Sequence, residues 1–207
     1  MRAAFLAFFL LASSCLHAVE PSVVMNDWIA AQQQMGDIKV DFKMIRTLAT
    51  MKEPITNEGR FWRLADGRFR WELGTPPSTV LVFDNKDLYL LDDTQKQWQT
   101  LSPNEGRMRM WMHFLNSKDL NAEQVSKDFT ATITGDTPEL ITVALQPKGF
   151  MVKKHLKQID LQIDPKTKHL RQIQMVQADD STMLMAFSRP EDISANDKTQ
   201  LQLTPSS

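Results

Sequence analysis

The chain has 207 residues, of which 42% are hydrophobic and 24% charged, and its formal net charge is -1 at pH 7. This profile is typical of a globular domain, and a net charge so close to zero argues against a nucleic-acid surface. The sequence also lacks a nucleophile elbow, a phosphate-binding loop and an H-E-x-x-H motif, and its histidines have no ligand spacing. We therefore expect a protein that is not an enzyme, with no catalytic residues, no bound metal and no cofactor.

The first eighteen residues have the pattern of an export signal. Arg2 precedes the apolar run AAFLAFFLLA, and small residues follow up to a cleavage site after Ala18. We therefore predict a signal peptide over residues 1–18 and one domain over residues 19–207, located in the periplasm. An alternative starts from LASSC, which loosely resembles a lipobox and would make Cys15 the point of attachment of a lipid anchor in a membrane.

The residues after the signal predict a helix followed by a long strand. Ser22 is placed to cap the helix and Gly36 to end it. From Ile38 the apolar residues alternate with polar ones, which is typical of a half-buried strand. The apolar residues of the helix recur with helical spacing: Val24, Trp28, Ala31 and Met35.

Short strands separated by turn sequences fill most of the remaining chain. The breaks ADG, GTPPS, DNK, DDTQK, DPKTKH and QADDS leave no room for crossover helices, so the pairing should be antiparallel. We predict strands at Glu58 to Leu64, Arg68 to Leu73, Thr79 to Phe83, Asp87 to Leu91, Gln97 to Leu101, Phe129 to Thr134, Leu140 to Leu145, Gln158 to Ile163, Leu170 to Val176 and Thr182 to Ser188.

The methionine-rich stretch NEGRMRMWMHFLN fits either a strand or a helix. Ser102, Pro103 and Glu105 form a capping box just before it, which favours a helix over Pro103 to Asn116. Its apolar arc is wider than contact with one sheet requires, so this helix is our candidate for a mobile cover, and methionine suits irregular apolar partners. A second, short helix should start at Asn121.

The stretch from Gly59 to Leu101 resembles the periplasmic lipoprotein carrier family LolA. The glycine, the F-x-W at Phe69 to Trp71, Pro76, the D-N-K at Asp84 to Lys86, and Tyr89 stand in the family's order, and Ile163 to Ser188 resembles the family's closing hairpins. The resemblance implies an α+β, mainly β fold: an incomplete antiparallel β-barrel, a highly curved sheet with a helical lid over an apolar concave face.

The resemblance also implies a function. Family members hold the acyl chains of a lipoprotein in a hydrophobic cavity and carry it toward the outer membrane, between a donor complex at the inner membrane and an acceptor at the outer one. The expected partners are thus acylated lipoprotein or other lipid cargo, bound by a monomer. A lipid-anchored acceptor of the LolB kind, a paralogue with another lipid-linked cargo, or a lipid sensor stay open. The residues expected to line the cavity and lid are Trp28, Phe42, Met44, Phe69, Trp71, Val82, Leu90, Met108, Trp111, Met112 and Leu115.

Two local groups of basic residues bear on the expected function. The family typically carries Arg-Pro before the turn that follows its second strand, and its arginine helps to latch the lid, but this chain has Ala65 and Asp66 there; Arg63, Arg68 and Arg70 lie nearby. Further along, Phe150 precedes a basic run from Lys153 to Lys157. This run is typical of a solvated loop, and a contact with anionic head groups is the functional alternative.

Overall fold

The computed structural model describes residues 20–92, 97–103, 112, 115, 121–194 and 197–198. The predicted signal, with Cys15, lies outside these residues, and so does the predicted helix from Pro103 to Asn116 except for its first residue, Met112 and Leu115. Among the described residues, no helix is long and apolar enough to cross a membrane.

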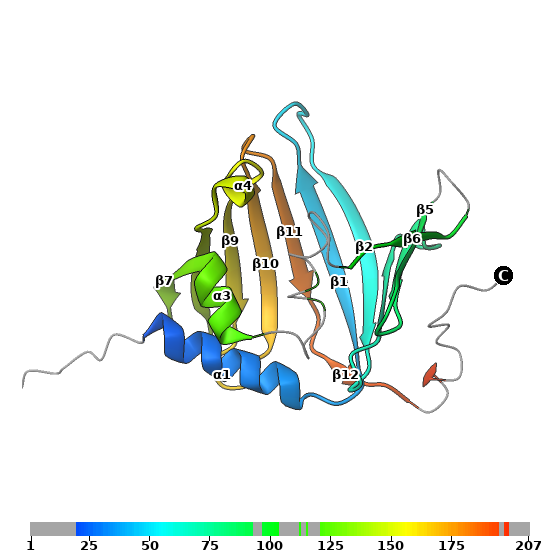
Figure 1. Cartoon of the computed structure of the whole chain (residues 1–207), viewed down its shortest axis with the longest axis horizontal. Helices are drawn as coiled ribbons and strands as arrows, with labels where there is room; N and C mark the ends of the chain where they lie inside the picture. Colours follow the sequence, from blue (N-terminus) through cyan, green and yellow to red (C-terminus); the bar gives the residue numbers. More distant parts are fainter. Residues whose placement is uncertain are drawn as a thin grey trace, which may run out of the picture.

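Twelve strands form a single antiparallel sheet that curves but does not close (Figure 1). Its order is β6-β5-β4-β3-β2-β1-β11-β10-β9-β8-β7, so two meanders meet where β1 pairs with β11. The predicted mainly β, incomplete barrel is therefore confirmed. The strands run over Ile38–Thr47 (β1), Ile55–Arg63 (β2), Phe69–Leu73 (β3), Thr79–Phe83 (β4), Leu88–Asp92 (β5), Gln99–Leu101 (β6), Phe129–Asp136 (β7), Ile141–Pro147 (β8), Leu156–Ile163 (β9), Leu170–Gln177 (β10) and Thr182–Phe187 (β11), with the two-residue β12 (Glu191–Asp192) beside the start of β1.

Helix α1 (Pro21–Gln34) starts earlier than the sequence suggested. The predicted cap, Ser22, lies inside the first turn, whereas Glu20 holds the N-cap position without a side-chain bond. Proline explains the difference, because the fixed φ of Pro21 suits the first helical position and its missing N–H would have had no partner there. At the other end Met35, not Gly36, is the C-cap.

Helix α3 (Ala122–Asp128) starts as predicted. The Asn121 side chain accepts hydrogen bonds from the backbone N–H groups of Glu123 (2.8 Å) and Gln124 (3.4 Å), which satisfies two of the free donors at a helix start. The predicted loop before β9 contains a single helical turn, α4 (Phe150–Lys153), in which Phe150 and Met151 are exposed while Val152 packs against the core.

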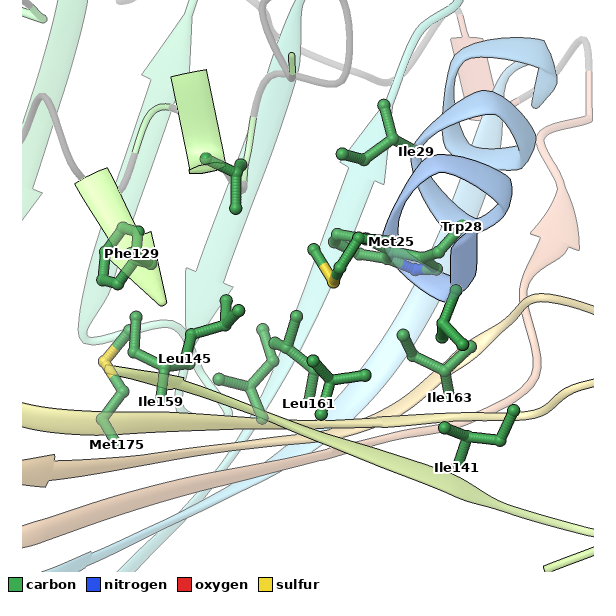
Figure 2. Close-up of a cluster of buried hydrophobic side chains, with 14 of the residues drawn as sticks. Met25, Trp28, Ile29, Phe129, Ile141, Leu145, Ile159, Leu161, Ile163 and Met175 are labelled. Carbon is green, nitrogen blue, oxygen red and sulfur yellow. The ribbon is translucent and has the colours of Figure 1, made fainter. Parts of the chain in front are cut away.

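The two larger helices cover one half of the inner face of the sheet. Met25 and Trp28 of α1 lie above the apolar side chains of strands β8 to β10, with Ile29 further from the sheet (Figure 2), and the sheet curls up around the side on which the helices lie (Figures 1 and 2). The core beneath them is close to fully buried, with Leu145, Ile159 and Leu161 at 0% exposure. We call this cluster the helix-covered core: Val24, Met25, Trp28, Ile29, Val125, Phe129, Ile141, Val143, Leu145, Leu156, Ile159, Leu161, Ile163, Ile173 and Met175.

Candidate functional site

The other half of the same face carries a second set of apolar side chains, of which about half are buried and the others only partly covered. Strand pairing places Phe42 opposite Phe187 and Met44 opposite Met185, and it places Phe61 opposite Trp71. Because alternate residues of a strand share a face, these side chains continue the face that α1 covers further along the sheet. We call the set the concave surface: Phe42, Met44, Phe61, Phe69, Trp71, Leu73, Leu81, Phe83, Leu88, Leu90, Leu101, Met183, Met185 and Phe187, with Met112 and Leu115 packed against it.

Aromatic rings run across this surface in two rows of contacts. Phe42 stacks on Trp71 with ring centroids 5.5 Å apart and an interplanar angle of 16°, and it lies 6.2 Å from Phe187. In the second row, Phe69 lies 5.7 Å from Phe61 and 5.4 Å from Phe83. Such pairs add to the burial of each ring, so the surface is ordered as well as apolar.

The concave surface combines buried side chains, such as Phe42 at 4% and Phe69 at 0% exposure, with side chains that stay partly open to water. The side chains of Phe61, Trp71, Leu73, Met183 and Phe187 stay half-buried, although they lie in the middle of the sheet. An apolar face left partly open to water in this way costs free energy that a bound apolar group would recover, about 25 cal/mol for each Å² covered.

Glycine makes room at the centre of the concave surface. Gly59 of β2 lies under the ring of Phe42, and a Cβ atom there would collide with that ring and with the backbone carbonyl oxygen of Glu72. The absent side chain lets Phe42 lie flat across its neighbour strand and reach Trp71.

One arginine lies on this apolar face. Arg63 is opposite Ile38 of β1 and Phe69 of β3, on the side of the sheet that carries Phe61. Only 4% of it is exposed, and burial in this apolar environment lowers the pKa of its guanidinium to about 10. Its Nε and Nη2 atoms are buried and have no hydrogen-bond partner among the described residues.

The outer face of the same strands is polar and paired. Arg60 donates to Asp41 at 2.6 Å and its guanidinium lies 5.5 Å above the ring of Trp62. Arg70 donates to Glu72 at 2.6 Å. Val82 of β4 also faces this side, opposite Arg70, and is fully buried.

The structure thus gathers most of the predicted site residues. Phe42, Met44, Phe69, Trp71, Leu90, Met112 and Leu115 lie on the concave surface or pack against it. Trp28 lies in the helix-covered core, and Val82 points away from the concave face, because alternation along β4 directs Leu81 and Phe83 inward instead. Met108 and Trp111 lie outside the described residues.

Sequence reasoning missed one side of the concave surface and the buried arginine on it. Met183, Met185 and Phe187 alternate along β11, and this pattern predicts one apolar face. The sequence does not show that β11 pairs with β1, which places this face beside Phe42 and Met44. For Arg63 the sequence from Arg60 to Arg63, R-F-W-R, gave no signal. Each face of this strand carries one arginine and one aromatic residue, so the pattern does not show which face is buried.

One further region carries polar groups that could bind a ligand. A hollow of about 350 Å³ beside α4 is lined mainly by polar groups and lysines, apart from the concave surface: Thr130, Gln146, Pro147, Lys148, Lys153, Leu156 and Lys157. In the part of the chain that the structure describes, no group of three or more His, Cys, Asp or Glu side chains is placed to hold a metal ion.

An open antiparallel barrel with helices across its apolar inner face is the class of protein that this fold and surface define. The chain belongs to the LolA family: the model of that family, described as outer membrane lipoprotein carrier protein LolA, matches residues 33–204. No curated protein matches the sequence.

Several solved structures have a similar fold at low identity. A LolA superfamily protein from Nitrosomonas europaea is 9% identical, with 89% of this chain and 99% of that chain covered and a TM-score of 0.45. LprF from Mycobacterium bovis is 14% identical, with 84% and 94% covered and a TM-score of 0.47. The MucA/MucB complex from Pseudomonas aeruginosa matches at 12% identity, with 91% and 62% covered and a TM-score of 0.46.

Proposed function

We propose that this protein is a periplasmic carrier that binds the acyl chains of lipoproteins, or of related lipids, on its concave surface and transfers them toward the outer membrane. The observation that carries the proposal is the row of rings and methionines, with Phe61, Trp71, Met183 and Phe187 left half-buried, on a face whose other half is covered by helices. Membership of the LolA family supports the same function.

Methionines give the surface the adaptability that a carrier needs. Met44, Met183 and Met185 lie together where β1 meets β11. Unbranched, polarizable side chains can follow the changing shape of a flexible acyl chain, whereas β-branched ones would favour one shape. Each methylene group covered contributes about 0.8 kcal/mol, so burial of about ten methylene groups suffices for micromolar binding.

The two tryptophans of β2 and β3 provide a matched test of the binding surface. Trp71 lies on the concave surface, opposite Phe61. Trp62 is the next residue after Phe61 in β2 and therefore lies on the outer face. We expect Trp71→Ala to weaken binding of the uncharged probe N-phenyl-1-naphthylamine by about tenfold or more, which corresponds to about 1.4 kcal/mol. Trp62→Ala should change it by less than about twofold, since surface changes contribute little.

The measurement is a fluorescence titration of wild type and both variants. Equal losses in the two variants, or no binding by wild type, would contradict the site. Transfer is tested separately, by adding the protein to inner-membrane vesicles that hold an acylated lipoprotein and following the lipoprotein into the soluble fraction. If the lipoprotein stays in the vesicles while the protein takes up free lipid, the cargo is another lipid-linked molecule and not a lipoprotein.

Exposed apolar side chains gather at one end of the sheet, where a carrier would meet a bilayer. Phe150 and Met151 of α4 are 73% and 66% exposed, and Met51 in the β1–β2 connection is 48% exposed. The two connections lie at the same end of the sheet (Figure 1). Lys154 packs its ammonium 4.8 Å from the ring of Phe150, and Lys52 and Lys153 are exposed close by in sequence. We include this end in the proposal as the surface that touches anionic membranes.

A further inference from the structure

Arg63 is a charged group for which the described protein supplies no counter-charge. Its neighbours across the strands are Ile38 and Phe69, both buried hydrophobic residues. No carboxylate contributes to the pKa of Arg63, which burial alone lowers to about 10. The guanidinium therefore keeps its charge at neutral pH, and no described carboxylate compensates it.

Two carboxylates lie near Arg63 in the strand pairing: Asp192 of β12, opposite Ile38 on the far side of β1, is exposed to solvent, and Asp37 is engaged elsewhere. Asp37 precedes Ile38, the partner of Arg63, but it accepts a hydrogen bond from the Ala65 N–H at 2.7 Å and forms an ion pair with Lys198. The cations that lower the pKa of Asp37 are Lys198 and Arg68, not Arg63. The other arginines of β2 and β3 contrast with this, because Arg60 and Arg70 each bond a carboxylate on the outer face.

A buried, unpaired guanidinium is expensive, and removing it in favour of an apolar side chain commonly stabilises a protein. Its planar fork is suited to bind a carboxylate or phosphate with two parallel hydrogen bonds. Arg63 stands at the end of β2, and the six residues back to Asn57, on the same face, span about 20 Å at 3.3 Å per residue. An acyl chain can lie along that distance with its polar end at Arg63.

We propose that Arg63 is a head-group site on the concave surface, and that the bound molecules include acyl chains that end in an anionic oxygen group, a carboxylate or a phosphate. This inference rests on the proposed lipid binding and narrows it, because a ligand with an ester or alcohol end would leave the guanidinium without a counter-charge. The free protein then bears the desolvation of Arg63, and the ligand relieves it.

The test compares ligands that differ only at the polar end. Palmitate, hexadecyl phosphate and hexadecanol are titrated to displace N-phenyl-1-naphthylamine from wild type, Arg63→Met, Arg63→Lys and Arg60→Met. We expect wild type to prefer at least one of the two anions over hexadecanol by about tenfold or more, the scale of a charge-assisted pair. Preference for palmitate alone or for hexadecyl phosphate alone identifies the head group as carboxylate or phosphate.

The variants separate a ligand site from a structural role. Arg63→Met should abolish the preference, keep the affinity for hexadecanol within about twofold, and raise the midpoint of thermal unfolding without ligand by a few degrees. Arg63→Lys should keep part of the preference, because it retains the charge without the fork. Arg60→Met is the matched control on the opposite face of β2 and should keep the wild-type preference.

Each failure has a distinct meaning. Equal affinity of wild type for all three ligands would overturn the role of Arg63 and leave the proposed lipid binding intact, whereas binding of none would overturn both. An Arg63→Met variant that retains the wild-type preference for the anion would make Arg63 a structural residue and overturn the inference.

Discussion

At the scale of single residues, the concave surface depends on the absence of a side chain at position 59. A methyl group on Gly59 would push Phe42 away from Trp71 and press on the Glu72 carbonyl oxygen, which is backbone and cannot rotate aside. We expect Gly59→Ala to lower the free energy of unfolding by about 2 kcal/mol, in the range of overpacked cores. Chemical denaturation measures it.

Gly36 provides the control for this prediction. Nothing lies within 4 Å of a Cβ built at Gly36, and its backbone φ is not in the left-handed region. Gly36→Ala should therefore leave stability unchanged or raise it by up to about 1 kcal/mol, through the lower entropy of the unfolded chain. A Gly59→Ala protein as stable as the Gly36→Ala protein would contradict the crowding argument.

Asp164 sets the acid sensitivity of the β9–β10 turn. Its carboxylate accepts from the N–H groups of Lys166 and Thr167, each at 3.0 Å, and from the Arg171 guanidinium at 2.9 Å. These bonds favour the charged form and hold the pKa of Asp164 far below its usual value. Since the folded pKa is depressed, the stabilisation is fully present above the unfolded pKa and is lost as pH falls below about 4.

Asp164→Asn should therefore destabilise the protein at pH 7 by about 1 kcal/mol, because the amide cannot replace the charge-assisted bonds. The deficit should shrink steadily below about pH 4, as the wild-type carboxylate is protonated. Unfolding midpoints of both proteins between pH 7 and pH 2 measure this. A deficit that does not depend on pH would contradict the assignment, and Glu53→Gln, at an exposed position, serves as the control.

At the scale of elements, α4 and the β1–β2 connection are predicted to act on membranes. Phe150 and Met151 lie on the surface beside lysines, so binding should combine burial of apolar side chains with attraction to anionic lipid. We expect Phe150→Ser with Met151→Ser to reduce co-sedimentation with phosphatidylglycerol vesicles at least about fivefold.

The control for α4 is an exposed apolar residue elsewhere. Val23 in α1 is 52% exposed, and Val23→Ser should leave sedimentation unchanged. Binding to phosphatidylglycerol should also weaken between low and physiological salt, since exposed lysines are screened over about 8 Å at 0.15 M. Equal binding to vesicles of phosphatidylcholine, which has no net charge, would show that the lysines do not contribute to membrane binding.

The elements also show what the sequence could predict. Alternation and turn chemistry placed every main strand, because a half-buried strand records its buried face in its own residues. Turn chemistry also fixed the antiparallel meanders. What stayed hidden depends on partners distant in sequence: the pairing of β1 with β11, which adds Met185 and Phe187 to the concave surface, and the face of β2 that buries Arg63.

The same reasoning explains the site residues that the structure places elsewhere. Val82 lies in the run T-V-L-V-F, where both faces are apolar, so the pattern could not tell which valine or leucine points inward. Trp28 was correctly expected to be buried, but only the position of α1 over β8 to β10 assigns it to the helix-covered core rather than to the concave surface.

At the scale of the whole molecule, one curved face is divided into a part that the protein fills itself and a part that it leaves partly open. The helix-covered core is closed by α1 and α3, so the backbone of β8 and β9 beneath it should open only with global unfolding. The concave surface beyond β11 is bounded by short strands, β3 to β6 having five residues or fewer, and carries half-buried rings. Its strands should therefore open locally at lower free energy.

Ligand binding should suppress local opening in the second part and act on the first part only through global stability. A ligand that binds the native state stabilises it by an amount set by its concentration relative to Kd, and local opening that breaks the site is suppressed by the same amount. In amide hydrogen exchange with saturating palmitate, we expect protection of β2, β3 and β11 to rise by about tenfold or more, while β8 and β9, already limited by global unfolding, change only as global stability does.

This pattern separates binding on the concave surface from binding in the hollow beside α4, which is lined from β7, β8 and β9. A ligand there would raise the protection of those strands and leave β2 and β3 unchanged. Trp71→Ala should remove the palmitate effect at β2, β3 and β11, whereas Trp62→Ala should retain it, because only the first tryptophan lies on the concave surface. Uniform protection of every strand in both variants would mean that the two parts of the face unfold together and that the division between them has no energetic basis.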